Sequence, residues 1–220
     1  MMINIAIDGP AGAGKSTVAK AVAKKLNFIY LDTGAMYRAV AYSAIKNGIA
    51  ITDEQAISEF VKTITMDIAY DENGEQQIFV FDENVTPYIR QNEISKAASD
   101  VSAYPAVRYR MVELQRIEAG KNNVVLDGRD IGTFVLPNAE YKFFMTASPE
   151  VRAKRRYDEL LARGQSVDYD KVLNDIITRD YNDSHRAVAP LKQAEDAVYL
   201  DTSNMTVEEV TNFIIDRIKL

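Results

Sequence analysis

The sequence predicts an α/β protein built on a parallel β-sheet, with an antiparallel hairpin inserted into it. Short apolar segments of strand length alternate with longer segments of helical period along most of the chain. Residues 64–70 instead alternate apolar and polar side chains, and the extended pattern continues over 77–81 after a turn. The 220 residues are 47% hydrophobic and 26% charged, which is typical of one large domain or a core with small appended subdomains.

The first elements are expected to follow the order strand, loop, helix, strand, helix. Residues 4–7 form a β-branched run, and a glycine-rich turn separates it from the alanine-rich helical segment 16–26. A second strand is expected at 28–31. A helix over 36–47 is expected to end at Gly48, because glycine suits the left-handed conformation just past a helix end.

An antiparallel hairpin is expected next, within the region from about 35 to 104. Apolar residues alternate with polar ones over 64–70, and the extended pattern returns over 77–81. Asn73 and Gly74 mark the turn between them.

Three later segments are expected to be strands of the parallel sheet. Each is a short apolar run of the length typical of strands that are buried on both faces. They are residues 124–126, 142–146 and 198–200.

Helices are expected between and after these strands. One covers 105–118, beginning at a proline and followed by Gly120 after its end. Another covers 149–164. Thr206 and Glu209 have the spacing of a capping box ahead of a final amphipathic helix.

Composition narrows the function classes. The chain has 26 basic and 32 acidic residues, a formal net charge of −6, so we expect neither nucleic acid nor a membrane as a partner. It has no cysteine and one histidine, His185, which excludes disulfides and the usual zinc sites. Without a signal-peptide pattern or a long apolar run, a cytoplasmic location is expected.

The glycine-rich turn matches the full phosphate-loop pattern Gly-x-x-x-x-Gly-Lys-Ser over residues 9–16. It follows an expected strand and precedes an expected helix, which is the context that this motif requires. Backbone amides of such a loop surround phosphate oxygens, and the helix N-terminus adds positive charge. Lys15 is then expected to reach the β- and γ-phosphates, and the Ser16 hydroxyl to bind Mg²⁺.

The rest of the chain favours a small-molecule kinase over other nucleotide-binding classes. A GTPase switch would carry an Asn-Lys-x-Asp guanine motif, which this sequence lacks, and a motor would need further domains. A kinase needs an acceptor pocket. Polar clusters at 32–38 and 127–130 follow expected strands, and a third cluster has helical spacing: Arg179, Asp183 and Arg186. Each cluster alone has the simpler interpretation of a surface ion pair.

The helix at 149–164 is rich in arginine. Arg152, Arg156 and Arg163 are spaced by four and seven residues, so their guanidinium groups can face one target, and arginine suits bidentate phosphate recognition. We expect a mobile lid over ATP. A solvated basic face and a nucleic-acid patch are the alternatives.

Four motifs in order make the chain resemble the bacterial cytidylate kinases, a branch of the nucleoside monophosphate kinases. They lie at residues 7–16, 31–38, 127–133 and 186–191. The first is shared by many phosphate-loop proteins, whereas the other three are more specific. Thr33 stands where serine is common in the family, and it keeps the hydroxyl group.

The resemblance implies one domain over 1–220: a phosphate-loop kinase with a five-stranded parallel sheet, a monophosphate-binding insert and a helical lid. The core would comprise about 1–34, 105–148 and 166–220, with the hairpin-containing insert at about 35–104 and the lid at about 149–165. The implied reaction transfers a phosphoryl group from ATP, with Mg²⁺, to CMP or dCMP. The resemblance also implies a monomer.

The resemblance further implies roles for individual residues. Arg38, Arg129 and Arg179 would bind the acceptor phosphate, Asp183 and Arg186 the sugar, and Ser99, Arg108 and Asp130 the base. Thr33 and Tyr37 would complete the acceptor site, and the catalytic groups would be Lys15, Arg129 and Arg179. The expected ATP contacts are Gly9, Pro10, Ala11, Gly12, Ala13, Gly14, Lys15, Ser16, Thr17, Arg152, Arg156 and Arg163.

Three alternatives stay open at this point. The acceptor could be UMP, AMP or another small molecule, and outside the kinases a nucleotide switch or an RNA-binding protein remains. Asp127 could orient magnesium-bound water or could end its strand with a hydrogen bond.

Overall fold

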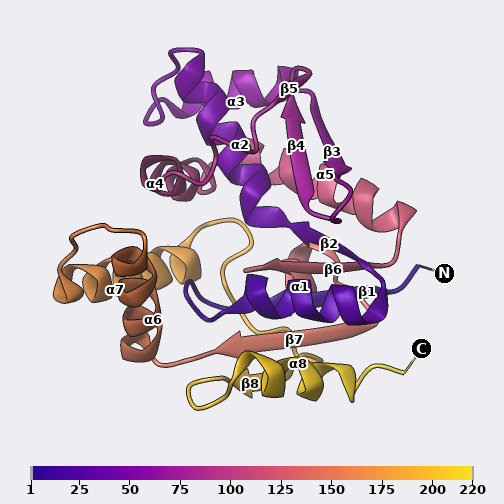
Figure 1. Cartoon of the computed structure of the whole chain (residues 1–220). Helices are drawn as coiled ribbons and strands as arrows, with labels where there is room; N and C mark the ends of the chain where they lie inside the picture. The colour runs from indigo at the N-terminus through magenta and orange to yellow at the C-terminus, as the bar shows by residue number, and fades with distance from the viewer. Residues whose placement is uncertain (1, 220) are drawn as a thin grey trace. The chain divides into compact units, whose positions relative to one another are not determined.

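The computed structural model describes residues 2–219 (Figure 1). The chain forms two compact units: residues up to Tyr30 together with those from Asn123 onward, and the segment Leu31–Asn122. The second unit extends beyond the expected insert at both ends. It includes the helix α5, Pro105–Lys121, which packs on the preceding helices of the same unit.

The central sheet has five strands in the order β2-β6-β1-β7-β8 (Figure 1). Strand β1 lies in the middle and pairs in parallel with β6 and β7, while β7 pairs in parallel with β8. In this register Asp8 lies opposite Gly128, so both chain segments leave the sheet at the same edge. The strands are β1 (Asn4–Asp8), β2 (Ile29–Asp32), β6 (Val124–Gly128), β7 (Tyr141–Thr146) and β8 (Val198–Asp201).

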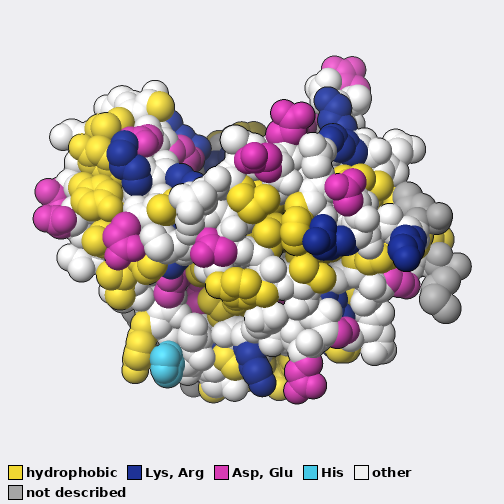
Figure 2. Space-filling view, turned by 90° about the horizontal axis from the view of Figure 1, so that it is seen from below, with side chains coloured by type: hydrophobic (Ala, Val, Ile, Leu, Met, Phe, Trp, Pro, Cys, Tyr) yellow, Lys and Arg dark blue, Asp and Glu magenta, His cyan; other side chains and the backbone are white. Residues whose placement is uncertain are grey.

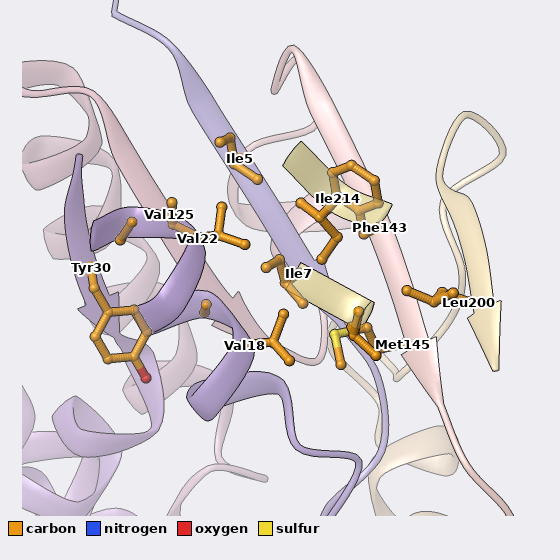
Figure 3. Packing of buried hydrophobic residues seen from close by; sticks show 13 residues of the cluster. Ile5, Ile7, Val18, Val22, Tyr30, Val125, Phe143, Met145, Leu200 and Ile214 are labelled. Atoms are coloured by element: carbon orange, nitrogen blue, oxygen red, sulfur yellow. The ribbon is translucent and has the colours of Figure 1, made fainter. Parts of the chain in front are cut away.

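The core of the first unit lies between this sheet and two helices (Figure 3). The helix α1 (Lys15–Leu26) contributes Val18 and Val22, and α8 (Val207–Ile215) contributes Ile214. They pack against strand residues that include Ile7 and Phe143. Burying each such side chain contributes roughly 1.5–3 kcal/mol, so this packing holds the sheet edge in place.

Strand β8 differs from the sequence prediction. We expected it to be buried on both faces, but Val198 and Tyr199 are exposed and Leu200 is buried. The reason is its position at the edge of the sheet, where an apolar run does not guarantee two covering layers.

The second unit contains the predicted antiparallel hairpin. Strands β3 (Met66–Tyr70) and β4 (Gln76–Val80) pair with Ile68 opposite Ile78, and Gly74 adopts φ 74° in the turn. A short third strand that the sequence did not predict, β5 (Glu83–Asn84), pairs with β4.

Four helices accompany this hairpin: α2 (Thr33–Lys46), α3 (Glu54–Thr63), α4 (Asn92–Val101) and α5. Helices α3 and α4 were not predicted. Helix α2 begins earlier than expected, because the Asp32 carboxylate caps it by accepting from the Ala35 amide at 2.8 Å. Gly120 lies inside α5 and does not follow its end, so that expectation was wrong.

The remaining helices belong to the first unit. The helix α6 (Pro149–Ala162) begins at Pro149, as predicted, with Ser148 as its cap, and ends two residues before the expected position. It packs on α7 (Tyr169–His185) through a small separate apolar cluster. The predicted capping box of Thr206 and Glu209 is present at the start of α8. A single turn of π-helix, η1 (Ile131–Val135), follows β6.

The surface drawn in Figure 2 mixes charges of both signs. Lysine and arginine side chains lie between aspartate and glutamate side chains on this face, with hydrophobic side chains among them. Within residues 2–219, none of the helices has the length and apolar character needed to cross a membrane.

Candidate functional site

The phosphate loop has backbone conformations that favour glycine. Gly12 and Gly14 have φ values of +75° and +83°, in the left-handed region. At Gly9 a Cβ atom would lie 1.8 Å from the Met145 carbonyl oxygen, so no larger residue fits beside β7. Helix α1 begins at Lys15, which leaves its unpaired N-terminal amides beside the loop.

The Lys15 ammonium group is buried next to this loop. Its Nζ donates to the Pro10 carbonyl oxygen at 2.8 Å. Burial, reinforced by the positive charge of Arg129, holds the pKa of Lys15 well below its usual range, although the carboxylates of Asp127, Asp8 and Asp183 oppose this shift. An anionic phosphate is the partner that would compensate a charge in such a place.

Asp127 lies beside the loop and contacts Ser16. Its Oδ2 accepts from the Ser16 hydroxyl at 2.8 Å, and its Oδ1 accepts from the Tyr30 hydroxyl at 2.7 Å. A serine hydroxyl and a carboxylate are hard oxygen donors of the kind that hold Mg²⁺ together with water and phosphate oxygens, so the residues present fit this ion. Among the described residues, no group of three or more potential acidic, histidine or cysteine ligands gathers at one point.

Asp8 is a polar residue of the site that the sequence analysis did not identify. It is buried, and its two carboxylate oxygens accept from the backbone amides of Ile131 and Gly132 at 2.8 and 2.7 Å. Burial raises the pKa of Asp8 to about 7, while these two amides and Lys15 oppose the shift and Asp130 adds to it. An acidic residue ending an apolar strand, directly before the glycine loop, was the available signal.

The loop after β6 and the end of α7 form a cluster of buried ion pairs. Arg129 Nε donates to Asp183 Oδ2 at 2.8 Å, and Arg186 donates to Asp130 Oδ1 at 3.0 Å. Asp183 also lies 3.8 Å from the guanidinium group of Arg186. The predicted clusters at 127–130 and 179–186 therefore meet within one unit.

The charges in this cluster shift one another's pKa values. Burial opposes the ionisation of both Arg129 and Asp183, but their mutual attraction outweighs it, so the pKa of Arg129 is raised and that of Asp183 is lowered. Arg179 lies one helical turn before Asp183, and its charge also lowers the pKa of Asp183. Arg186 follows the last residue of α7, His185, so the helix carries only two of the three predicted positions.

The second unit holds the other predicted acceptor residues. The Arg38 guanidinium pairs with the Asp32 carboxylate at 2.9 Å, and Thr33 is buried at the start of α2. The Arg108 guanidinium lies 5.7 Å from the centroid of the Tyr37 ring. Ser99 is half-buried on α4.

Gln76 is a further residue that the sequence did not reveal. Its side-chain oxygen accepts from the Asp32 amide at 2.7 Å, and its amide group donates to the Asp32 carbonyl oxygen at 3.4 Å. The hairpin therefore holds the residue that caps α2 and pairs with Arg38. Gln76 and Asp32 are 44 positions apart in sequence, so no local pattern could predict their contact.

The arginines of α6, Arg152 and Arg156, and its C-cap residue Arg163 lie in different surroundings. The Arg152 side chain is 4% exposed and donates to the carbonyl oxygens of Ala147 and Ala11 at 2.8 and 3.0 Å, and to the Asp180 carboxylate at 2.6 Å. Arg156 and Arg163 are more exposed, and both pair with Glu159. Helical spacing alone did not indicate that Arg152 is buried whereas Arg156 and Arg163 are more exposed.

The fold and the loop define the class of protein: an α/β nucleotide-binding protein of the phosphate-loop kinase fold. A shikimate kinase from Bacteroides thetaiotaomicron has a similar fold, with a TM-score of 0.51 and 16% sequence identity over the full length of both chains.

The family follows from closer relatives. The model of the cytidylate kinase family matches residues 5–220. The chain is 51% identical to a cytidylate kinase of Pelotomaculum thermopropionicum, over 98% of this chain and 95% of that one, and 48% identical to a cytidylate kinase of Halalkalibacterium halodurans, over 99% and 97%. The chain belongs to the cytidylate kinase family.

Proposed function

We propose that the protein transfers the γ-phosphoryl group of ATP to CMP or dCMP, which yields ADP and CDP or dCDP. The observation that carries this proposal is the combination, in a chain of this family, of a phosphate loop with the buried cluster of Arg129, Asp130, Asp183 and Arg186. A nucleotide switch would need the first feature but not the second.

ATP binds at the phosphate loop in this proposal. Backbone amides of the loop surround its phosphates, and Lys15 reaches the group that is transferred. Ser16 would hold Mg²⁺ directly and Asp127 would hold it through bound water, and the ion would neutralise the phosphate charge. The contact with Ser16 supports the first of the two roles considered for Asp127, that of orienting magnesium-bound water.

The acceptor needs no general base, because its phosphate oxygens are already anionic at neutral pH. Catalysis then consists of positioning and charge neutralisation by Lys15 and by the arginines that bind the acceptor phosphate. In this assignment those arginines are Arg38, Arg129 and Arg179.

Base recognition is assigned to Asp130 together with Ser99 and Arg108, with Thr33 and Tyr37 completing the acceptor residues. Cytosine presents an exocyclic amine that donates to a carboxylate, whereas uracil presents a carbonyl oxygen at the same place. A buried carboxylate such as Asp130 therefore favours cytosine. Asp183 and Arg186 bind the ribose.

We also propose the insert at about 35–104 and the lid at about 149–165, with Arg152, Arg156 and Arg163 acting on ATP. The protein would act as a cytoplasmic monomer whose partners are ATP and CMP or dCMP, without nucleic acid or membrane. The acidic charge balance supports the last point. Light scattering coupled to gel filtration tests the monomer, and a dimer mass would contradict it.

The proposed function is tested by a coupled ADP-release assay with CMP, dCMP, UMP, AMP and GMP as acceptors. We expect CMP and dCMP to give the highest kcat/KM. A higher value for UMP, AMP or GMP would replace this proposal with a kinase of other base specificity, and no turnover with any of them would refute it.

The base assignment is tested by Asp130→Asn. The amide keeps the size of the side chain, removes its charge and can donate to uracil. The loss of transition-state stabilisation for CMP, calculated from kcat/KM, should therefore exceed about 1.5 kcal/mol, and kcat/KM for UMP should rise relative to that for CMP. Arg186 keeps its contact with Asp183 in this variant. Thermal melting checks folding, and an unchanged ratio of CMP to UMP would reassign Asp130 to holding Arg186.

A further inference from the structure

The carboxylate of Asp8 connects two loops that leave neighbouring strands. Asp8 ends β1 and directly precedes Gly9 of the phosphate loop. Its oxygens bind the amides of Ile131 and Gly132, which belong to the loop after β6. The contact therefore joins residues 123 and 124 positions apart in sequence.

The two amides need an acceptor from outside their own segment. They are the first two residues of η1, where helical amides have no partner within the helix, and both residues are buried from water. Asp8 supplies both acceptors from another strand. The approach is close, because a Cβ atom at Gly132 would lie 3.4 Å from Asp8 Oδ2 and 3.1 Å from the side chain of Lys142.

The residues just before these amides are Arg129 and Asp130. Both form ion pairs with the end of α7, at 2.8 and 3.0 Å, so their side chains occupy fixed places once the loop is fixed. A shift of the Ile131 and Gly132 amides would move both side chains together. A displacement of about 1 Å at reacting groups can cost about 10²-fold in rate.

We propose that Asp8 is a positioning residue for phosphoryl transfer: by holding the amides of Ile131 and Gly132, its carboxylate sets the place of Arg129 and Asp130 relative to the phosphate loop. The proposal rests on the proposed function in that Arg129 and Asp130 bind the acceptor. Both oxygens are required, because an asparagine would offer one acceptor and turn a donor toward the second amide.

The kinetic test is Asp8→Asn, with Asp201→Asn as the matched control. Asp201 also ends a strand and accepts a backbone amide, that of Ser203 at 2.9 Å, but it is exposed. We expect kcat/KM for CMP to fall about 10- to 100-fold in Asp8→Asn, with KM for ATP changed less than about 3-fold. The control should match wild type. A loss confined to KM for ATP, or no change in CMP kinetics, would overturn the positioning role.

A second variant changes the loop side of the contact between Asp8 and Gly132, in case Asp8→Asn does not fold. Gly132→Ala places a methyl group against Asp8 and Lys142 while leaving the carboxylate unchanged. We expect a rise in KM for CMP of about 3- to 10-fold in a folded protein, because the added methyl group crowds Lys142 and the Asp8 carboxylate, and a displacement of Asp8 would loosen its hold on the two amides. Wild-type CMP kinetics in this variant would count against the proposal.

Hydrogen exchange separates this inference from the proposed function, because it needs no substrate. In wild type the amides of Ile131 and Gly132 should exchange slowly, and Asp8→Asn should remove the protection of at least one of them while β6 keeps its own. Fast exchange of both amides in wild type would overturn the contact itself. If wild type fails to phosphorylate CMP but these amides are protected, the proposed function is refuted, whereas the hydrogen bonds from Asp8 to the loop after β6 are confirmed.

Discussion

The phosphate loop and helix α6 were both predicted to contact ATP, yet only the loop has the arrangement that its sequence pattern indicated. In the loop, Gly9, Gly12 and Gly14 all adopt positive φ, and helix α1 follows at once. At α6, the arginines predicted to act together are a buried Arg152, a partly exposed Arg156 and an exposed Arg163, and the last two pair with Glu159.

The two regions differ because the loop binds phosphate through its backbone, whereas the arginines of α6 would bind it through their side chains. A phosphate loop acts mainly through backbone amides, whose directions are set by local conformation and therefore by local sequence. A guanidinium group acts through a long side chain, whose partner is whatever the fold brings near. Arg152 reaches Ala11 of the loop and Asp180 of α7, and neither contact has a counterpart in the spacing of the arginines.

The largest effect is expected for Lys15→Ala. Lysine meets the transferring phosphoryl group in the proposed reaction, so kcat should fall by about 10³-fold or more while the fold is retained. The measurement is steady-state turnover with saturating ATP and CMP, with a thermal melt of the variant. Turnover near wild type in a folded variant would remove the loop from the reaction.

A matched pair of substitutions tests the division within α6. Arg152→Gln leaves Asp180 and the Ala11 carbonyl without their donor, and we expect a loss of about 3 kcal/mol in the free energy of unfolding. Arg156→Gln removes a partly exposed pair, with an expected loss of about 0.5 kcal/mol or less. Urea unfolding without nucleotide measures both. Equal losses would show that Arg152 does not join α6 to the loop.

The exposed pair is expected to affect ATP binding and not stability. In the double variant Arg156→Gln, Arg163→Gln, KM for ATP should rise about 10-fold, since two charge-assisted phosphate contacts are removed. The unfolding midpoint should stay near wild type, and CMP affinity measured without ATP should not change. A change in CMP affinity alone would exclude these residues from the lid role.

The smallest difference between two matched variants is expected for alanine in the loop, compared at Gly12 and Gly14. Both positions have positive φ, so each alanine should cost about 1 kcal/mol of stability. At Gly12 the added Cβ also lies 3.2 Å from the Cβ of Arg152, whereas at Gly14 nothing lies within 4 Å. We therefore expect Gly12→Ala to lose about 1 kcal/mol more than Gly14→Ala in urea unfolding. Equal losses would show that α6 does not constrain the loop.

The other elements also divide into features set by adjacent residues, which were predicted, and features set by packing, which were not. The hairpin turn at Gly74 and the capping box of α8 were predicted because a few adjacent residues suffice to set each. Helices α3 and α4 and the exposure of β8 were missed. An edge strand and a central strand can have the same apolar run, and only the number of layers packed on each distinguishes them.

The sequence by itself determined the parallel sheet, the phosphate loop and the resemblance to cytidylate kinases, because each depends on residues that are close together in the chain. Only the tertiary structure revealed that Asp127 faces Ser16, that Asp8 binds the loop after β6, and that Arg152 is buried against Ala11. Each of these contacts joins residues more than 100 positions apart. Buried charges and amides must find partners wherever packing places them, and that placement follows from strand order and not from local sequence.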